Sequence, residues 1–489
     1  MLTFPEYETF DAVGLAALIR RGDIAPEVVL TAAIERMDAR NAAVGAVVHR
    51  MDEEARRTLA ARVAGPFAGV PYLLKDLNVL YAGQPTRNGS RSFETYLADH
   101  DSTIVRRLKA AGLIIAGKTT TPEYGVGPCA EPAAQNIVAR NPWDLSRTPG
   151  GSSSGAAAAV AVGMVPAAHA TDGGGSIRIP ASWCGLFGLK PTRARNPVGP
   201  DVGEGWSGLG VGHAITRSVR DAAALLDATH GPEPGAPYVA PAPVRPFLEE
   251  VAIPPGRLRI GVARTSPTGT RLHPDVVAAT DAAAQLCAGL GHIVEEAVPD
   301  LDGWAMAWAY RLVIGANLAN LVDQRGNALG KPLGAGDVEP VTRMWADEGR
   351  RRSAVEYTRM TQIIHAIGRQ LAAFFARYDV LLSPTVGEPP LPIGEISMQN
   401  GNLDSYIAQV WNLIPFTLPI NFAGTPAATL PLHWSAGGLP IGVQIATRFG
   451  DEATIFRLAG QLEQARPWFN RRPPTTAAGA GGSTSSGAS

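Results

Sequence analysis

Two serines flanked by glycines are the residues of this sequence best placed for hydrolytic chemistry. Ser152 lies in the run Gly150-Gly-Ser-Ser-Ser-Gly155, and Ser176 ends the run Asp172-Gly-Gly-Gly-Ser176. Glycine has no side chain to block a substrate and tolerates unusual φ values, so successive N–H groups can be aimed at one ligand atom. Donors placed just before a serine are what an oxyanion hole requires. The predicted oxyanion-hole residues are Gly173, Gly174 and Gly175.

The elements expected between the two serines bring them together. An Ala-rich helix over about residues 153–163 is roughly 16 Å long at 1.5 Å per residue. A returning strand over residues 165–171 covers roughly 23 Å at 3.3 Å per residue. The chain therefore leaves Ser152 and returns close to it. Ser152 and Ser176 are expected at the same end of this helix–strand unit, each on a glycine-rich turn.

A lysine follows a short apolar stretch upstream of both serines. Gly69-Val-Pro-Tyr-Leu-Leu-Lys75 predicts a strand that runs into a loop, and the apolar residues before Lys75 indicate that its amine is buried. Burial disfavours the charged form of lysine and lowers its pKa. Taken alone, Lys75 beside Asp76 is more consistent with a solvated ion pair.

The serine segments also have structural interpretations when each is taken alone. Ser152 or Ser153 can cap the Ala-rich helix, and the three glycines can form only a tight turn. Asp172 and Arg178 are expected to pair or to bond nearby backbone, so we group them with Ser153 as residues that support the loop. His169 is expected to be a core histidine rather than a catalyst.

Two familiar motif matches are disfavoured by their context. Residues 112–119 match the P-loop pattern, but the apolar residues 113–116 predict a buried strand, and Pro122 interrupts the helix that should follow. Residues 151–155 match the nucleophile elbow Gly-x-Ser-x-Gly, yet no apolar strand precedes them. An esterase of that type would also need a downstream acid and histidine, for which His433 is one unremarkable candidate.

Composition excludes several classes of protein. The 489 residues are 45% hydrophobic and 18% charged, which allows a large core and excludes global disorder. The net charge of −1 gives no reason to expect nucleic acid or an anionic membrane as a partner. Cys129, Cys184 and Cys287 form no metal spacing and no disulfide framework. With no visible secretion signal and no apolar run long enough to span a bilayer, we expect a soluble cytoplasmic protein.

Helices and short apolar strands interleave along the chain, which predicts an α/β fold with a helix-covered sheet. We expect one domain over residues 1–472, with a helical N-terminal part at about 10–62 and an inserted lobe at about 232–394. Residues 473–489 are almost entirely Pro, Thr, Ala, Gly and Ser, which indicates a disordered tail.

Taken together, these segments resemble the amidase signature family, and the similarity covers roughly residues 10–472. The matching segments are Gly69 to Asp76, Gly117 to Glu123, Asn141 to Trp143, Gly150 to Gly155, Gly163 to Pro166, Thr171 to Ala181, Gly188 to Thr192, Phe416 to Pro419, Gly424 to Pro426 and Gly438 to Gln444. The resemblance implies a large mixed twisted sheet with helices on both faces. It also implies Ser176 as nucleophile, Ser152 as a bridging serine after a cis peptide bond, and Lys75 as the base. No metal or organic cofactor is implied.

The resemblance further implies a small-molecule amide or carbamate substrate and a monomer or homodimer. Within the family the chain looks closest to hydrolases of nylon-related cyclic amides and to urethane-cleaving amidases. It departs at Ile314, where the cyclic-amide hydrolases have a pocket cysteine. The candidate pocket residues, each of which fits a core position equally well, are Val126, Pro128, Cys129, Ile314 and Trp411. Three alternatives stay open: a transamidase component that uses glutamine and charged tRNA, a Ser-His-Asp esterase, and a catalytically inactive binding module.

Overall fold

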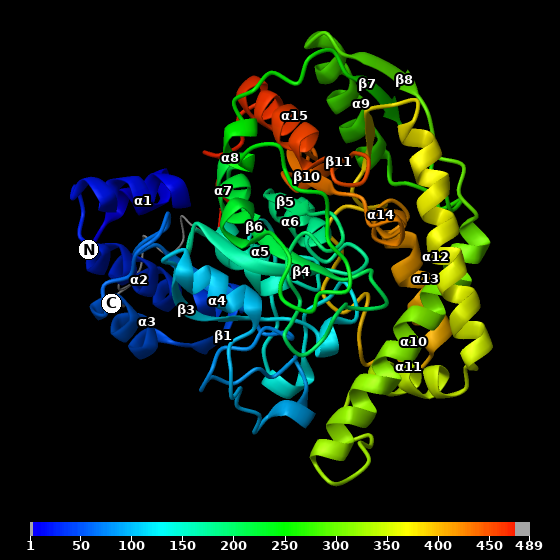
Figure 1. Ribbon diagram of the computed structural model, residues 1–489, viewed down its shortest axis with the longest axis horizontal. Helices are drawn as coiled ribbons and strands as arrows, with labels where there is room; N and C mark the ends of the chain where they lie inside the picture. Colours follow the sequence, from blue (N-terminus) through cyan, green and yellow to red (C-terminus); the bar gives the residue numbers. More distant parts are fainter. Residues whose placement is uncertain (1–2, 475–489) are drawn as a thin grey trace, which may run out of the picture.

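One mixed sheet runs through residues 3–474, the part of the chain that the computed structural model describes (Figure 1). Its strands are β1 (Val47–Arg50), β2 (Pro71–Lys75), β3 (Ile114–Thr119), β4 (Ala167–Asp172), β5 (Phe187–Lys190), β6 (Val211–Thr216), β7 (Arg259–Val262), β8 (Ile293–Glu296), β9 (Val380–Pro384), β10 (Ala427–Trp434) and β11 (Pro440–Ala446). They lie in the order β1-β3-β2-β4-β6-β5-β10-β11-β9-β7-β8. The pairs β2–β3, β2–β4, β7–β8 and β7–β9 are parallel, and the remaining neighbours are antiparallel.

Helices make up most of the remaining ordered structure. They are α1 (Ala12–Arg21), α2 (Pro26–Val44), α3 (Asp52–Ala60), α4 (Thr103–Ala110), α5 (Ser154–Ala161), α6 (Arg178–Cys184), α7 (Val219–Thr229), α8 (Phe247–Glu250), α9 (Pro274–Gly289), α10 (Gly303–Ala328), α11 (Pro340–Arg350), α12 (Ala354–Phe375), α13 (Leu403–Leu413), α14 (Thr417–Ala423) and α15 (Glu452–Ala465). In Figure 1, α1 to α3 lie on one side of the molecule, and α10 to α12 lie on the other.

Alternating side chains of the central strands bury both faces of the sheet under helices. In β2, Leu73 packs into an apolar cluster with α5 and α6, whereas Tyr72 and Leu74 pack into a second cluster with α4 and α7. Successive strand residues point to opposite faces, so these two clusters mark the two sides. The Ala-rich α5 is wholly buried against β2, β3, β4 and β6, because its small side chains permit close approach.

The observed elements match most of those expected. The helix-covered α/β sheet is confirmed, and the apolar residues of the P-loop match form strand β3 rather than a phosphate-binding loop. Strand β1 was not expected, because it lies inside the segment predicted to be helical and pairs with β3 at the sheet edge. Within residues 232–394, β7, β8 and β9 belong to the common sheet. The domain division and the inserted lobe stay predictions, and residues 475–489 of the predicted tail lie outside the described residues.

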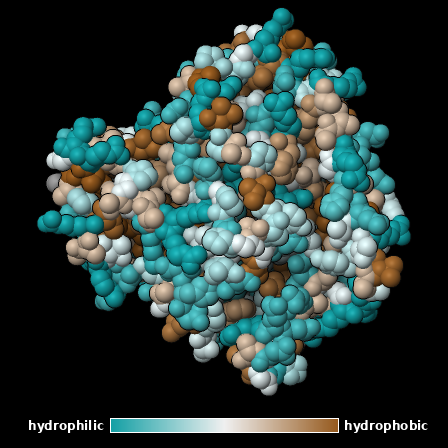
Figure 2. All heavy atoms as spheres, viewed as in Figure 1, coloured by the Kyte–Doolittle hydropathy of each residue, from teal (hydrophilic) through white to brown (hydrophobic). Residues whose placement is uncertain are grey.

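The surface in Figure 2 is largely polar, with apolar side chains scattered in small groups. No helix within residues 3–474 is both long and apolar enough to cross a membrane. All three cysteines are buried as free thiols.

Candidate active site

The turns that carry the two serines lie against each other. The N–H of Ser153 donates to the carbonyl oxygen of Ser176 at 3.3 Å. The Ser153 hydroxyl also bonds both backbone groups of Thr171, at 3.2 Å each. The Ser153 hydroxyl does not cap α5 and instead links the turn that carries Ser152 to the end of β4. The predicted return of the chain to Ser152 is therefore confirmed, and the peptide bond between Gly151 and Ser152 is cis.

Lys75 reaches this junction from the end of β2. Parallel pairing of Leu73 with Ala168 aligns β2 with β4, which places the end of one strand beside the end of the other. The Lys75 Nζ lies 2.8 Å from the Oγ of Ser152 and 2.8 Å from the Oγ1 of Thr171. The side chain is fully buried, and burial lowers the pKa of Lys75 to about 7, although the nearby charge of Asp172 opposes the shift.

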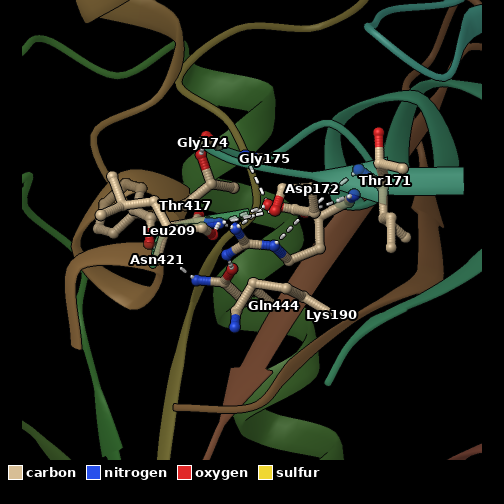
Figure 3. Close-up of polar contacts among 12 residues, drawn as sticks. Thr171, Asp172, Gly174, Gly175, Lys190, Leu209, Thr417, Asn421 and Gln444 are labelled. Carbon is tan, nitrogen blue, oxygen red and sulfur yellow. Dashed lines mark hydrogen bonds and ion pairs between the residues drawn. The ribbon is translucent and has the colours of Figure 1, made fainter. Parts of the chain in front are cut away.

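The glycine loop is shaped by a position that only glycine fits. Gly175 has a φ of +133°, and a Cβ there would lie 2.7 Å from the Oγ1 of Thr417. The Thr417 hydroxyl donates to the carbonyl oxygen of Gly174 at 2.7 Å (Figure 3). The N–H of Gly175 donates to Asp172 at 2.8 Å, which differs from its predicted role as an oxyanion-hole donor. The N–H groups of Gly173, Gly174 and Ser176 have no acceptor among the described residues, so they are free to bind a ligand.

An ionic cluster holds the start of this loop (Figure 3). Asp172 and Arg178 are fully buried and form a two-pronged ion pair, with both nitrogen–oxygen distances at 2.9 Å. Asn421 donates to Asp172 at 2.9 Å, and Arg178 donates to Gln444 at 2.7 Å. Burial alone would raise the pKa of Asp172, but the charge and hydrogen bonds of Arg178 lower it to about 2. The cluster therefore remains ionised and fixes the backbone before Ser176.

The candidate pocket residues are distributed around an apolar wall beside Ser152. Val126, Cys129 and Ile314 belong to one buried cluster, and the partly buried Trp411 packs against it. Pro128 is also buried, and a Cβ on Gly151 would lie 2.9 Å from the carbonyl carbon of Pro128. The structure thus brings the 126–129 segment to the bridging turn and places Ile314 and Trp411 in the same apolar layer. Their role in binding substrate stays a prediction.

Sequence reasoning gave no role to Thr171, Thr417, Asn421 or Gln444. The strongest available signal was polarity in an apolar context, since Asn421 and Gln444 each interrupt a run of buried apolar residues. A buried polar side chain requires a partner, but the sequence does not say which one. Among residues 3–474, no group of three His, Cys, Asp or Glu side chains is placed to hold a metal ion.

Comparisons with known proteins agree with this geometry. The family model described as Amidase matches residues 28–456. A 6-aminohexanoate-cyclic-dimer hydrolase from Paenarthrobacter ureafaciens is 39% identical over 479 residues, covering 95% of this chain and 96% of its own. A putative amidase from Synechocystis is 35% identical over 468 residues, covering 93% of this chain and 88% of its own.

Solved structures show the same architecture. A 6-aminohexanoate cyclic dimer hydrolase complexed with substrate has a TM-score of 0.92 at 37% identity, with 96% of this chain and 99% of that chain covered. A bacterial aryl acylamidase has a TM-score of 0.86 at 25% identity, with coverages of 97% and 99%. Because the family model and these relatives span nearly the whole sheet and both serine turns, the chain belongs to the amidase signature family, whose members hydrolyse carbon–nitrogen bonds other than peptide bonds.

Proposed function

We propose that this protein is a small-molecule amidase that cleaves amide or carbamate bonds with Ser176 as nucleophile, Ser152 as bridging serine and Lys75 as base. The observation that carries the proposal is the position of the Lys75 amine. This amine is fully buried and lies 2.8 Å from the hydroxyl of Ser152. The turn that carries Ser152 is itself hydrogen-bonded to Ser176. A lysine accepts a proton only when it is neutral, and with a pKa of about 7 roughly half of the molecules hold it neutral at pH 7.

The proton path follows from this order of residues. As the Oγ of Ser176 attacks the carbonyl carbon, its proton passes to Ser152 while the Ser152 proton passes to Lys75. The new oxyanion is bound by free N–H groups of the glycine loop, and one such donor is typically worth about 3 kcal/mol of barrier. Ser152, reprotonated from Lys75, then gives its proton to the leaving nitrogen. A water molecule, deprotonated along the same path, releases the acyl or carbamoyl group from Ser176.

The Asp172 cluster supports this path without exchanging protons. Its carboxylate receives the N–H of Gly175, which leaves Gly173, Gly174 and Ser176 as the oxyanion donors. With Thr417 bonded to the carbonyl oxygen of Gly174, the loop is held from both sides before substrate arrives. Donors that are fixed in advance need no reorganisation in the transition state.

Hydrolysis of a cyclic amide is the second candidate. It is favoured by the TM-score of 0.92 to the 6-aminohexanoate cyclic dimer hydrolase, against 0.75 for a glutamyl-tRNA(Gln) amidotransferase component from Thermotoga maritima. The resemblance implies that the cyclic-amide hydrolases have a cysteine at the position of Ile314, which favours a pocket of different shape here. Purified protein assayed against aryl amides, aryl carbamates and the 6-aminohexanoate cyclic dimer separates these substrates, and activity that appears only with a partner enzyme and charged tRNA would identify the transamidase alternative.

The decisive test of the nucleophile is Ser176→Ala. We expect kcat to fall by at least about 10⁴-fold, as when other serine nucleophiles are removed, with unchanged thermal unfolding because the Ser176 carbonyl bond to Ser153 is retained. A fluorophosphonate probe should label the wild type and not the variant. Ser154→Ala is the matched control, because the Ser154 hydroxyl is buried without a hydrogen-bond partner among the described residues. Retained turnover in Ser176→Ala would refute the assignment.

The pH profile tests the base. Since Lys75 must lose its proton, kcat of the wild type should rise with pH through about 7 and then level off. His169 in β4 is a histidine that interacts with the charge of Lys75, and burial lowers its pKa to about 3. It remains neutral throughout this range, so with His169 as the base the rate would not change through about pH 7.

A further inference from the structure

A groove of about 520 Å³ lies beside α14, on a different side of the helix from the glycine loop. Thr417 and Asn421 of α14 face the loop, whereas Phe422 and Ala423 line the groove. The opposite wall is α12, which packs beside α14 in Figure 1, and the turn after β11 closes one end. The volume is within the range of pockets that hold small organic ligands. A molecule bound here touches neither Ser152 nor Ser176.

Basic side chains dominate the polar lining of this groove. His365 and Arg369 stand one turn apart on α12, and neither has a hydrogen-bond or ion-pair partner among the described residues. Arg448 reaches the groove from the turn after β11; it pairs with Asp451 at 3.2 Å, but its side chain is 70% exposed. Arg193 lies deeper and donates to the carbonyl oxygens of Asn421 and Phe422 at 3.0 and 2.7 Å. None of the lining residues in the described chain is acidic, so the groove is suited to an anion.

An unsatisfied hydroxyl marks the floor. Thr425 is 4% exposed, and its Oγ1 has no hydrogen-bond partner among the described residues, although it lines the groove. Buried hydroxyls nearly always have a partner, and a ligand in the groove can supply one when the Thr425 side chain turns toward it. The apolar part of the lining includes the aromatic rings of Phe375, Phe422 and Phe449, together with Ile364 and three alanines. These rings favour a ligand with a flat or apolar body over a bare inorganic anion.

We propose that this groove is a second ligand site, which binds a small organic carboxylate carrying an aromatic ring or a short alkyl chain. The carboxylate is held by Arg369 and Arg448, whose guanidinium groups suit paired donation to two oxygens. The Thr425 hydroxyl, once its side chain turns toward the groove, donates to the same end of the ligand, and the apolar body packs on the phenylalanines. The site does not depend on the proposed catalytic chemistry, because none of its residues belongs to the serine–lysine arrangement.

Titration calorimetry of the full chain with benzoate tests the proposal, with inorganic phosphate as the comparison anion. We expect saturable benzoate binding to wild type and to Ser176→Ala alike, and weaker binding of phosphate. The double variant Arg369→Gln/Arg448→Gln should weaken benzoate binding by about tenfold or more, the loss expected for one charge-assisted contact. Both side chains are exposed, so the variant should fold as wild type does.

Two further variants locate the ligand. Thr425→Val, which keeps the shape of the side chain and removes its hydroxyl, should weaken benzoate binding severalfold. Arg359→Gln is the control, because Arg359 lies on the exposed surface of the same helix, stacked over Trp308 and away from the groove. The proposal is overturned by an absence of saturable benzoate binding, by equal affinity for phosphate, by loss of binding in Ser176→Ala, or by unchanged binding in the double arginine variant.

Discussion

Two adjacent residues of β4 contact two buried basic side chains that differ in how readily they lose a proton. Thr171 contacts Lys75, and Asp172 contacts Arg178. Both cationic side chains are fully buried. Arg178 faces a carboxylate whose pKa is lowered to about 2, so that pair stays charged. Lys75 is contacted by two hydroxyls and no carboxylate, and its pKa falls to about 7.

The difference has two causes, because a guanidinium holds its proton far more strongly than an amine does and because the two side chains have different partners. Desolvation acts on both cations, but only Arg178 has an anion at hydrogen-bond distance to offset it. A lowered pKa is still not a signature of catalysis. Burial also lowers the pKa of Lys190 to about 7 and of Lys118 to about 8, and their amines contact backbone carbonyls or Thr86. Lys75 differs from both because its partner, Ser152, is on the turn that is bonded to Ser176.

Of the substitutions that test this comparison, replacing Lys75, the basic side chain that loses its proton near pH 7, should have the largest effect on kcat. In Lys75→Met we expect kcat to fall by about 10³-fold or more, in the range of a lost general base. Lys75→Arg should be equally impaired, since a guanidinium does not lose its proton near neutral pH. Steady-state kinetics on an aryl amide gives the measurement.

Lys118→Met is the matched control for Lys75, because it removes a second buried lysine that contacts no serine. We expect lower stability but a kcat within severalfold of wild type in the molecules that fold. If Lys75→Met kept most of its activity while Lys118→Met lost it, the neutral amine at Ser152 would not be the base.

For the Asp172–Arg178 ion pair, neutralising Asp172 should produce the largest effect on the free energy of unfolding. Asp172→Asn keeps the shape of the side chain but leaves Arg178 buried without an anion, so the free energy of unfolding should fall by about 3 kcal/mol. The same change removes the charge that opposes the low pKa of Lys75, so the midpoint of the kcat profile should move to lower pH. Urea unfolding and a pH–rate series measure the two effects.

A second buried ion pair separates those effects. Glu452 and Arg195 are almost wholly buried and lie 2.9 Å apart, and Glu452 does not contact the serine turns. Glu452→Gln should therefore cost a similar free energy of unfolding and leave the midpoint of the kcat profile unchanged. An equal shift of the midpoint in both variants would show that loss of stability, rather than the charge of Asp172, moves it.

Local patterns were sufficient to predict much of this arrangement. The glycine runs, the Ala-rich helix and the returning strand are contiguous, so their geometry follows from element lengths, and the two serine turns do meet. The apolar stretch before Lys75 indicated a buried amine, because a strand with apolar residues on both faces lies inside a sheet. The neighbouring Asp76 taken alone favoured a solvated ion pair instead.

The remaining features depend on contacts between distant segments. Asn421 and Gln444 meet Arg178 only because α14 and β11, which are distant in sequence, bring these two side chains to the start of α6, and no local pattern specifies that meeting. Thr171 was overlooked because a β-branched residue at the end of a strand is ordinary for β-structure. Strand β1 was missed because four residues between two helices carry little periodic signal. The groove at α14 has contributions from α12 and the turn after β11, so its lining does not appear as a motif.

The smallest predicted effect is a change in how stability depends on pH. The pKa of Lys75 is about 7 in the folded chain and about 10.4 in an unfolded one. Between these values the unfolded chain binds a proton that the folded chain does not, so the free energy of unfolding rises with pH, by about 1.4 kcal/mol per unit for one such group. Lys190 and Lys118, whose pKa values are also lowered, contribute in the same direction.

Lys75→Met should therefore reduce the slope of the free energy of unfolding against pH by about 1.4 kcal/mol per unit over roughly pH 8 to 9.5, without abolishing it. Urea unfolding at a series of pH values gives the slope, and the half-exposed Lys331, replaced by Met, is the control that should leave it unchanged. Equal slopes in wild type and Lys75→Met would mean that Lys75 keeps its proton in the folded state, and the contrast with Arg178 would then disappear.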